Sequence, residues 1–544
     1  MKLKSTLLLT ISALLLIGMI VLEYRINGIT DYSKSLLSDE QYDTLLSSHE
    51  LMSTALVSDI YIDDQKLIYD VNDNTFYCSK TEGVDFEKIV IEKNQTNSAF
   101  EILGFNTIKA GIINDNKIIL YNRDFISVSD FVISSLPFVN ITVSADTVKD
   151  LGLDETYHID YYTGAELTLY DNRVDFDGVS RTTTSDIKIH VRGGTTIYLP
   201  QKSYRITLIE DKNNINSANK KENLLGLRND DDWILYSSYS DYEKVRNVFS
   251  MNLWNATSKG RNQWNVDACN EYVFVEAFFN NRYHGLYALG YPIDSKQLDR
   301  QEDESIIRKK DWTASEYAMD VEYNEDFGFD WIAGYYLQKG SSDAYYPIHD
   351  LLYAMAYSQD NDVIRSTVDM DNAIDLYLFY QLTQAYDNIY DTKVKNLFII
   401  NKPANNVWGY KLLLVPWDMD QTWGNRYVDG EGNHGISSYS MSTDYELPIN
   451  WGPVPFLIKN GDDKIIDEVQ TRYKELRDTI WSDENIDAIL SSYEDDIYHS
   501  GAFERTMNRW PDGNYYDPVS ELSDFKAFAQ DRLNWMDEYV KGLH

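Results

Sequence analysis

Acidic and amide side chains stand at the ends of two apolar runs in the last third of the sequence. Asp391 and Asn396 are five residues apart and lead directly into the first run. The second run ends at Trp417 and is followed at once by Asp418 and Asp420. Hard oxygen ligands of this kind hold Mg²⁺, and a further carboxylate can orient a nucleophile. The spacing predicts a divalent-metal and phosphate site at the tips of two strands.

Lys202, much earlier in the chain, is a candidate for binding phosphate. Residues 186–192 alternate between apolar and polar side chains and run into a Gly-Gly-Thr-Thr loop. Lys202 then shares its side of the next strand with Tyr204 and Ile206, so alternation directs its ammonium toward the apolar face. A lysine there needs an anion, although a residue at a strand start can also bend out to solvent. The loop from Arg192 to Thr196 can present backbone N–H groups to phosphate, or it can be an ordinary turn.

The composition describes a folded, acidic protein. Its 544 residues are 43% hydrophobic and 14% aromatic, and 87 acidic against 49 basic residues give a net charge of −38. That charge argues against nucleic acid or an anionic membrane surface as a partner. It suits a soluble acidic surface, or an enzyme that gathers metal cations or basic proteins. Cys78 and Cys269 form no disulfide framework, and the eight His show no zinc-binding spacing.

The N-terminal sequence predicts where the protein is located in the cell. Lys2 and Lys4 precede an uncharged, mainly apolar run from Ser5 to Leu22, which Glu23 ends. The run is near the length that spans a bilayer, and no small-residue cleavage site follows it. We therefore favour an uncleaved signal anchor within residues 1–30 over a cleaved signal peptide. Positive charges before the span predict that the rest of the chain is extracytoplasmic, either anchored to the membrane or, after cleavage, secreted.

The remaining chain is predicted to fold as two regions. Residues 31–133 are predicted to be a polar helical linker, with helix-start chemistry at Ser38-Asp39, followed by a small β-rich domain. Residues 134–544 begin with a new series of strands and end with helical patterns. Ser240-Asp241 is expected to cap a helix, and Asn280-Asn281 is expected to turn a hairpin.

The order of these parts is that of a protein kinase. A lysine for the phosphates precedes an Asp, an Asn five residues later and a further Asp for the metal. However, the sequence contains no G-x-G-x-x-G, H-R-D or D-F-G motif, which excludes an ordinary kinase.

Eight short motifs, in order from Leu136 onward, resemble those of the spore-coat protein H (CotH) family of atypical, secretory-type kinases. The motifs are L-P-F-V-N-I, V-R-G-G-T-T, P-Q-K-S-Y-R-I, L-L-G-L-R-N-D-D-D-W-I-L-Y, Y-S-D-Y-E-K-V-R-N, F-F-N-N-R-Y-H-G-L-Y-A-L, D-T-K-V-K-N-L-F-I-I and V-P-W-D-M-D-Q-T-W-G. The resemblance implies an α+β, atypical protein-kinase-like fold with a β-rich N-lobe and a mainly helical C-lobe. It also implies ATP with Mg²⁺ or Mn²⁺ as cofactors and Ser/Thr phosphorylation of envelope, surface or spore-coat proteins.

The resemblance also implies roles for individual residues. Lys202 would bind the ATP phosphates and Asp391 would be the catalytic carboxylate. The covering loop would consist of Arg192, Gly193, Gly194, Thr195 and Thr196. The metal would be held by Asn396 and Asp418, with Asp420 nearby. The family often has R-G-N-S-S where this chain has R-G-G-T-T, so the side-chain contacts of this loop differ.

Several alternatives stay open. Asp387 stands four residues before Asp391 and could exchange roles with it; we favour Asp391, because only it precedes Asn396 by five positions. The protein could transfer AMP or glutamate instead of phosphate, act on glycans at the cell surface, or serve as an inactive kinase-fold scaffold in coat assembly.

Overall fold

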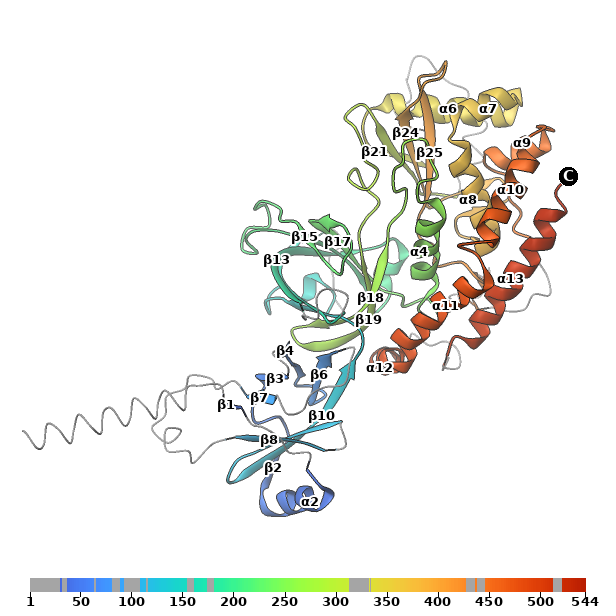
Figure 1. Ribbon diagram of the computed structural model, residues 1–544. Coiled ribbons are helices and arrows are strands. Elements are labelled where there is room, and N and C mark those ends of the chain that lie inside the picture. Colours follow the sequence, from blue (N-terminus) through green and yellow to red (C-terminus); the bar gives the residue numbers. More distant parts are fainter. Residues whose placement is uncertain are drawn as a thin grey trace, which may run out of the picture. The chain divides into compact units, whose positions relative to one another are not determined.

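The computed structural model of the chain describes a mixed α+β protein, with strands dominating its first part and helices its last part (Figure 1). The described residues are 30–31, 37–62, 65–80, 89–91, 108–113, 116–153, 161–173, 181–312, 332, 334–426, 436–437, 446–511 and 521–544. The predicted α+β class is confirmed. The predicted membrane span from Ser5 to Leu22 lies outside these ranges, and no helix inside them is long and apolar enough to cross a bilayer.

The chain forms two compact units. The first consists of Met1–Ala145, Ala165–Asp186 and Val275–Gly285. The second consists of Asp146–Gly164, Ile187–Phe274 and Leu286–His544.

The first unit opens with the helix α2 (Asp39–Ser48). Ser38 caps it: its hydroxyl accepts from the Gln41 N–H and the Gln41 side chain accepts from the Ser38 N–H, a reciprocal capping box. This confirms the helix start predicted at Ser38-Asp39. Apolar side chains of α2, including Leu45, pack against a buried cluster in the sheet that follows. The helix is therefore part of the unit's core rather than a free linker.

Two sheets build most of the first unit, as the short alternating runs predict. The larger sheet has the order β5-β6-β10-β9-β8, with β2 also paired to β10. Its strands are β2 (Glu50–Met52), β5 (Ile68–Asp70), β6 (Thr75–Ser79), β8 (Lys109–Ile113), β9 (Lys117–Tyr121) and β10 (Phe125–Ser134). The smaller sheet, β1-β7-β3-β4, consists of β1 (Thr30–Asp31), β7 (Ile89–Ile91), β3 (Ile60–Ile62) and β4 (Gln65–Lys66).

A closed barrel has the strand order β11-β12-β13-β14-β17-β19-β18. Its strands are β11 (Phe138–Thr142), β12 (Thr163–Asp171), β13 (Arg181–Arg192), β14 (Ser203–Leu208), β17 (Asp232–Tyr236), β18 (Tyr272–Phe279) and β19 (Arg282–Gly290). Asn280 and Asn281, both with positive φ, turn the β18–β19 hairpin as predicted.

In the second unit, the register of β13 against β14 explains where each polar side chain of these strands lies. Ile189 pairs with Ile206 and Val191 with Tyr204, and all four side chains are buried on one face. Strand alternation therefore places the intervening polar residues of β13 on the other face.

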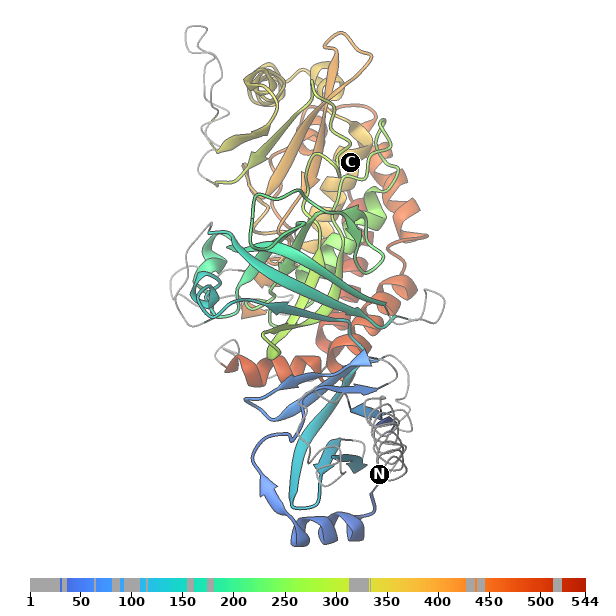
Figure 2. The ribbon, with the colours of Figure 1, turned by 90° about the vertical axis from the view of Figure 1, so that its left-hand side faces the viewer.

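The remainder of the second unit is a four-stranded sheet, β21-β20-β24-β25, with helices on it (Figure 2). The strands are β20 (Ser305–Lys309), β21 (Tyr335–Lys339), β24 (Leu397–Pro403) and β25 (Tyr410–Pro416). Helix α8 packs on β25, and α4, α10 and α13 pack on α8. The main helices are α4 (Arg246–Ser258), α6 (Tyr345–Tyr353), α7 (Asn361–Thr367), α8 (Met370–Thr383), α9 (Pro453–Lys459), α10 (Ile465–Arg477), α11 (Asp483–Glu494), α12 (Ala502–Arg509) and α13 (Ser523–Lys541).

The start of α4 differs from the prediction. The helix begins at Arg246, five residues after the cap expected at Asp241, and Val245 occupies the capping position without a side-chain bond. Asp241 is nevertheless used, because its carboxylate accepts from the Arg246 N–H at 2.6 Å. It satisfies one of the free N–H groups of the first turn from outside the helix.

Candidate active site

Antiparallel pairing of β24 with β25 brings two of the predicted metal ligands to one edge of the sheet. Leu397 lies opposite Pro416, and the Trp417 N–H donates to the Asn396 carbonyl at 2.9 Å. Asn396 therefore directly precedes one strand, and Asp418 follows the end of its neighbour. Both have left-handed backbones, with φ of +51° and +59°. Such φ values are uncommon outside glycine and recur where a side chain has to be aimed.

Asp387 is the carboxylate that meets Asn396. Its Oδ2 accepts from the Asn396 Nδ2 at 3.1 Å, and Lys395 Nζ lies 2.6 Å from its Oδ1. Burial raises the pKa of Asp387, and the nearby charge of Asp418 acts in the same direction against Lys395. The three carboxylate and amide side chains thus form one electrostatically connected group.

Asp391 lies elsewhere, although its spacing to Asn396 matches the kinase pattern. Residues 389–394 form a small hairpin of β22 (Ile389–Tyr390) and β23 (Lys393–Val394), and Asp391 stands at its exposed turn with φ of +55°. Its carboxylate accepts from Asn450 Nδ2 at 2.7 Å, and its backbone bridges to Ile449. The structure brings Asn396 and Asp418 together as expected, with Asp387 in the place expected for Asp391.

Asp420 completes a group of crowded acids. Burial raises its pKa well above the ordinary value, and the negative charges of Asp418, Asp387 and Asp241 add to that rise. Burial raises the pKa of the Tyr236 hydroxyl, and the charges of Asp420, Asp418 and Asp241 add to that rise. A cation bound among these oxygens would relieve the repulsion that raises both pKa values.

Two arginines supply positive charge beside Asp418. The guanidinium of Arg192 lies 5.5 Å from the centre of the Trp417 ring, and that of Arg308 lies 5.6 Å from the Phe398 ring. Burial lowers the pKa of each arginine, while Asp418 opposes that effect in both. Among the described residues, neither guanidinium has an ion-pair partner, and the buried Nε of Arg308 has no hydrogen-bond acceptor. Both therefore retain bonding capacity for an anion.

The loop after Arg192 requires its first glycine. Gly193 has φ of +138°, and a Cβ there would lie 2.2 Å from Thr196 Oγ1. A Cβ on Gly194 would meet nothing within 4 Å. Thr195 opens a short 3-10 turn, η3 (Thr195–Tyr198), that leads the chain back toward β14.

Lys202 is buried, as alternation predicts, but its observed contacts are with this loop. Its Nζ donates to the carbonyls of Ile197 and Leu199 at 3.1 and 2.9 Å, and burial lowers its pKa. Strand alternation places it on the face of Tyr204, whereas Arg192 pairs with Ser203 on the opposite face. Lys202 holds the end of the loop, and its predicted role at the phosphates stays a prediction.

The first turn of α4 supports the acidic loop. Asn247 Oδ1 accepts from the Met419 N–H at 2.9 Å, and Arg246 Nε donates to the Thr422 carbonyl at 3.1 Å. The Arg246 guanidinium is fully buried between Asp241 and Glu243. Neither Arg246 nor Asn247 is among the site residues predicted from the sequence. Arg308 was missed entirely, because nothing around it in the sequence distinguishes it from an ordinary strand arginine.

The family model described as CotH kinase protein matches residues 189–536 of the chain. This protein belongs to the CotH kinase family. The match confirms the resemblance and includes every described side chain of the site. No curated protein matches the chain significantly.

The oxygen-bearing side chains of this CotH kinase family member fit a divalent metal ion that takes only a few of its ligands from the protein. Within the described ranges, no three His, Cys, Asp or Glu side chains converge as a complete metal cage. Mg²⁺ typically uses one or two carboxylates, together with water and substrate phosphates. Asp418, Asp420 and the Asn396 amide can provide that set at the sheet edge.

Proposed function

We propose that this member of the CotH kinase family transfers the γ-phosphoryl group of ATP to Ser or Thr hydroxyls of a protein. The observation that carries the proposal is the group formed by Asp387, Asn396 and Asp418, with two arginines beside it that lack ion-pair partners in the described structure. Phosphoryl transfer depends mainly on positioning and on charge stabilisation, and these residues provide both.

Asn396, Asp418 and Asp420 would hold Mg²⁺ or Mn²⁺. The metal would supply positive charge to the β- and γ-phosphate oxygens as negative charge shifts toward the leaving group.

We assign to Asp387 the role that the family resemblance implied for Asp391. Its carboxylate is fixed by Asn396 and Lys395 and so can accept a hydrogen bond from the acceptor hydroxyl. The hydroxyl oxygen forms the new bond to the γ-phosphorus, the bond to the β-phosphate oxygen breaks, and ADP leaves. The hydroxyl proton passes to Asp387 or to the phosphoryl oxygens. A raised pKa of Asp387 favours its acceptance of this proton.

Arg192 and Arg308 would neutralise phosphate oxygens beside Asp418. Their positions next to Trp417 and Phe398 keep water from their faces, which strengthens their interaction with an anion. Gly193 and Gly194 bring backbone N–H groups close to the same region. Lys202 would act through this loop by holding its carbonyls.

The substrate protein is proposed to belong to the envelope, cell surface or spore coat. The apolar run from Ser5 to Leu22, which follows two lysines, supports membrane attachment with the catalytic part outside.

The test uses the full-length protein with ATP labelled in the γ-phosphate, and with Mg²⁺ or Mn²⁺. Incorporation of label into the protein or into an added Ser/Thr-rich acceptor supports the proposal, and mass spectrometry identifies the modified residue. A mass increase equal to AMP or glutamate would replace phosphoryl transfer with one of those reactions. Absence of any modification with both metals would favour a scaffold.

A further inference from the structure

A cationic pocket lies on the polar face of β13 and β14 in the second unit. It is an open cavity of about 460 Å³, and Lys188, His190 and Arg192 line it from alternate positions of β13. Tyr162 covers part of it: its ring lies 4.2 Å from the His190 ring, and Lys188 Nζ lies 5.7 Å from its centre. Arg192 is shared with the active site, so the pocket extends from that site along the strand.

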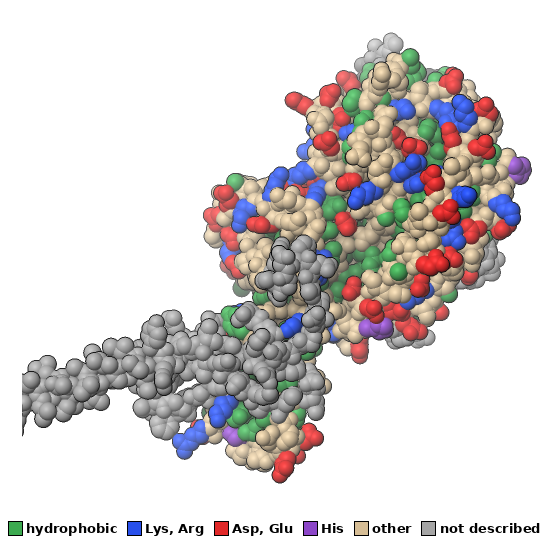
Figure 3. All heavy atoms as spheres, in the orientation of Figure 1, with side chains coloured by type: hydrophobic (Ala, Val, Ile, Leu, Met, Phe, Trp, Pro, Cys, Tyr) green, Lys and Arg blue, Asp and Glu red, His purple; other side chains and the backbone are tan. Residues whose placement is uncertain are grey.

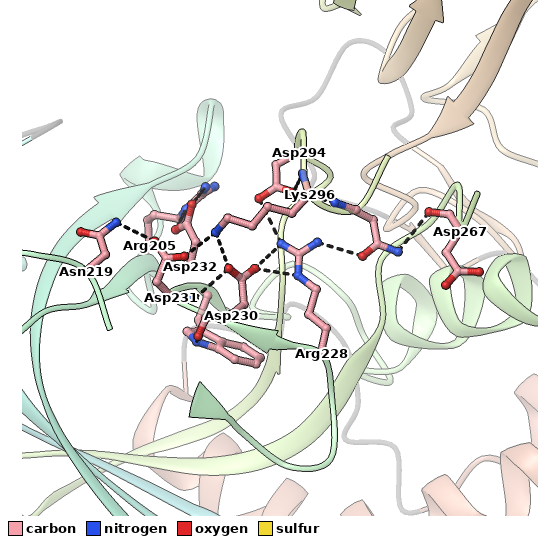
Figure 4. Close-up of polar contacts among 11 residues, drawn as sticks. Arg205, Asn219, Arg228, Asp230, Asp231, Asp232, Asp267, Asp294 and Lys296 are labelled. Carbon is pink, nitrogen blue, oxygen red and sulfur yellow. Dashed lines mark hydrogen bonds and ion pairs between the residues drawn. The ribbon is translucent and has the colours of Figure 1, made fainter. Parts of the chain in front are cut away.

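The acidic side chains of the pocket are already neutralised. Asp232 forms a two-pronged ion pair with Arg205 (Figure 4). Asp231 accepts from Lys296 at 2.5 Å and from Asn219 at 2.6 Å. Burial acts to raise the pKa of Asp231, but the bonds from Lys296 outweigh it and hold this pKa below the ordinary value.

The basic side chains are not balanced in this way. Within the described part of the chain, Lys188 and Arg192 have neither an ion pair nor a hydrogen bond, only contacts with aromatic rings. Two unpaired cations in one cavity attract an oxyanion, because charge-assisted hydrogen bonds to carboxylate or phosphate are the strongest that side chains form. The Tyr162 and Thr207 hydroxyls and the His190 ring add polar groups suited to such a ligand.

The position of Lys188 indicates whether the nucleotide or the acceptor protein supplies that anion. Lys188 and Arg192 are four positions apart on the strand, which corresponds to about 13 Å. ATP concentrates its charge at the phosphates, beside the metal, and has no anion to offer this far along the strand. The acceptor hydroxyl has to meet the γ-phosphate that Arg192 would bind. An extended peptide that continues from there along β13 can place an anionic side chain at Lys188, roughly four residues from the acceptor.

We propose that this pocket binds one anionic side chain of the acceptor protein, a carboxylate or a phosphorylated Ser or Thr, about four residues from the modified hydroxyl. The inference rests on the proposed function for the identity of the ligand. Acidic and basic side chains are interspersed on the face shown in Figure 3, and the net charge is −38. Recognition must therefore be local, by one anion on an otherwise neutral or basic segment, because a polyacidic segment would be repelled.

The test measures binding of fluorescent peptides to the full-length protein by anisotropy, without ATP or metal. Three peptides share one Ser in a neutral sequence and carry Glu, phosphoserine or Gln four residues away. We expect the Glu or phosphoserine peptide to bind about tenfold more tightly than the Gln peptide. The tighter of the two identifies the anion.

Lys188→Glu is expected to abolish this preference, while Lys464→Glu, at an exposed lysine outside the pocket, is expected to keep it. Lys188→Gln serves as a second variant, and thermal melting checks that each protein is folded. Equal binding of the three peptides, or an unchanged preference in Lys188→Glu, would overturn the proposal. Competitive displacement of the anionic peptide by ATP would also overturn it, because the pocket would then belong to the nucleotide. Since no transfer is measured, this result stands or falls independently of phosphoryl transfer.

Discussion

The Asp387 carboxylate accepts a hydrogen bond from the Asn396 amide at 3.1 Å, although nine positions separate the two residues in sequence. The small β22–β23 hairpin occupies the positions between them and carries Asp391 to its exposed turn. This contact, rather than motif spacing, is the reason for proposing Asp387 instead of Asp391 as the catalytic carboxylate.

Separate substitution of the two candidate carboxylates, Asp387 and Asp391, should have different effects on transfer. Asp387→Asn should lower phosphoryl transfer by about 10²–10³, because it removes the charge that orients the acceptor hydroxyl. Asp391→Asn should leave transfer within about threefold of the wild type, since its carboxylate contacts only Asn450 among the described side chains. Rates of label incorporation, with melting temperatures as a folding control, decide between them. Loss of transfer in Asp391→Asn alone would restore the motif-based assignment.

Arg308 should be important for activity but not for stability. Arg308→Met removes a buried guanidinium whose Nε has no acceptor in the described structure, so the free energy of unfolding should stay the same or rise. Transfer should fall by about 10²-fold if Arg308 stabilises phosphate charge. Lys310→Met, at the exposed position just beyond the same strand, is the matched control for loss of a cation. A large drop in melting temperature without loss of transfer would contradict this role.

Metal binding should stabilise the protein more strongly at higher pH. Because the folded-state pKa of Asp420 is raised, ionisation of Asp420 costs stability once the pH passes the ordinary carboxyl pKa, and the cost grows until the folded-state pKa is reached. Mg²⁺ or Mn²⁺ needs the ionised form and offsets this repulsion. The metal-induced rise in melting temperature should therefore be larger at about pH 8 than at about pH 6.

Asp420→Asn is the companion variant for this prediction. Without metal it should be as stable as the wild type or more stable at neutral pH, because one of the crowded charges is gone. The rise in melting temperature caused by metal should be smaller in Asp420→Asn than in the wild type. An equal metal response at the two pH values, with an unchanged response in Asp420→Asn, would place the cation elsewhere.

The two glycines of the loop should respond differently to alanine. Gly193→Ala should cost about 1–3 kcal/mol of unfolding free energy, because φ is +138° and the new Cβ would collide with Thr196 Oγ1. Gly194→Ala has open space and should change stability by less than about 0.5 kcal/mol. Denaturant unfolding measures both, and the KM for ATP should rise only in Gly193→Ala. Similar stability of the two variants would show that the loop relaxes freely.

The parts of the fold with strong periodicity were predictable from the sequence. The alternation around Ile189, the Asn280-Asn281 turn and the helices of the C-terminal part all appear as expected, since each follows from local backbone preferences and a single buried face. The meeting of Asn396 with Asp418 was also predictable, because both flank adjacent apolar runs.

The roles of Asp387, Arg308 and Lys202 depend on tertiary contacts that spacing does not encode. The β22–β23 hairpin between Asp387 and Asn396 carries Asp391 to its turn, and the five-residue spacing does not reveal that hairpin. Arg308 reaches the site only because β20 pairs with β24. For Lys202, alternation correctly indicated burial, but its hydrogen bonds to two loop carbonyls depend on how the loop folds back and could not be predicted from spacing.

The pairing of Leu397 with Pro416 has a practical consequence for engineering. The geometry of the acidic centre is set at one end of the β24–β25 hairpin, whereas the opposite end is a turn where Val407 is 92% exposed. Length changes at that distal turn leave the pairing near Leu397 intact, because strand register is maintained from the paired end. A tag or fluorescent reporter inserted next to Val407 would therefore label the β24–β25 hairpin without disturbing Asp418 and Asp420, which follow its other end.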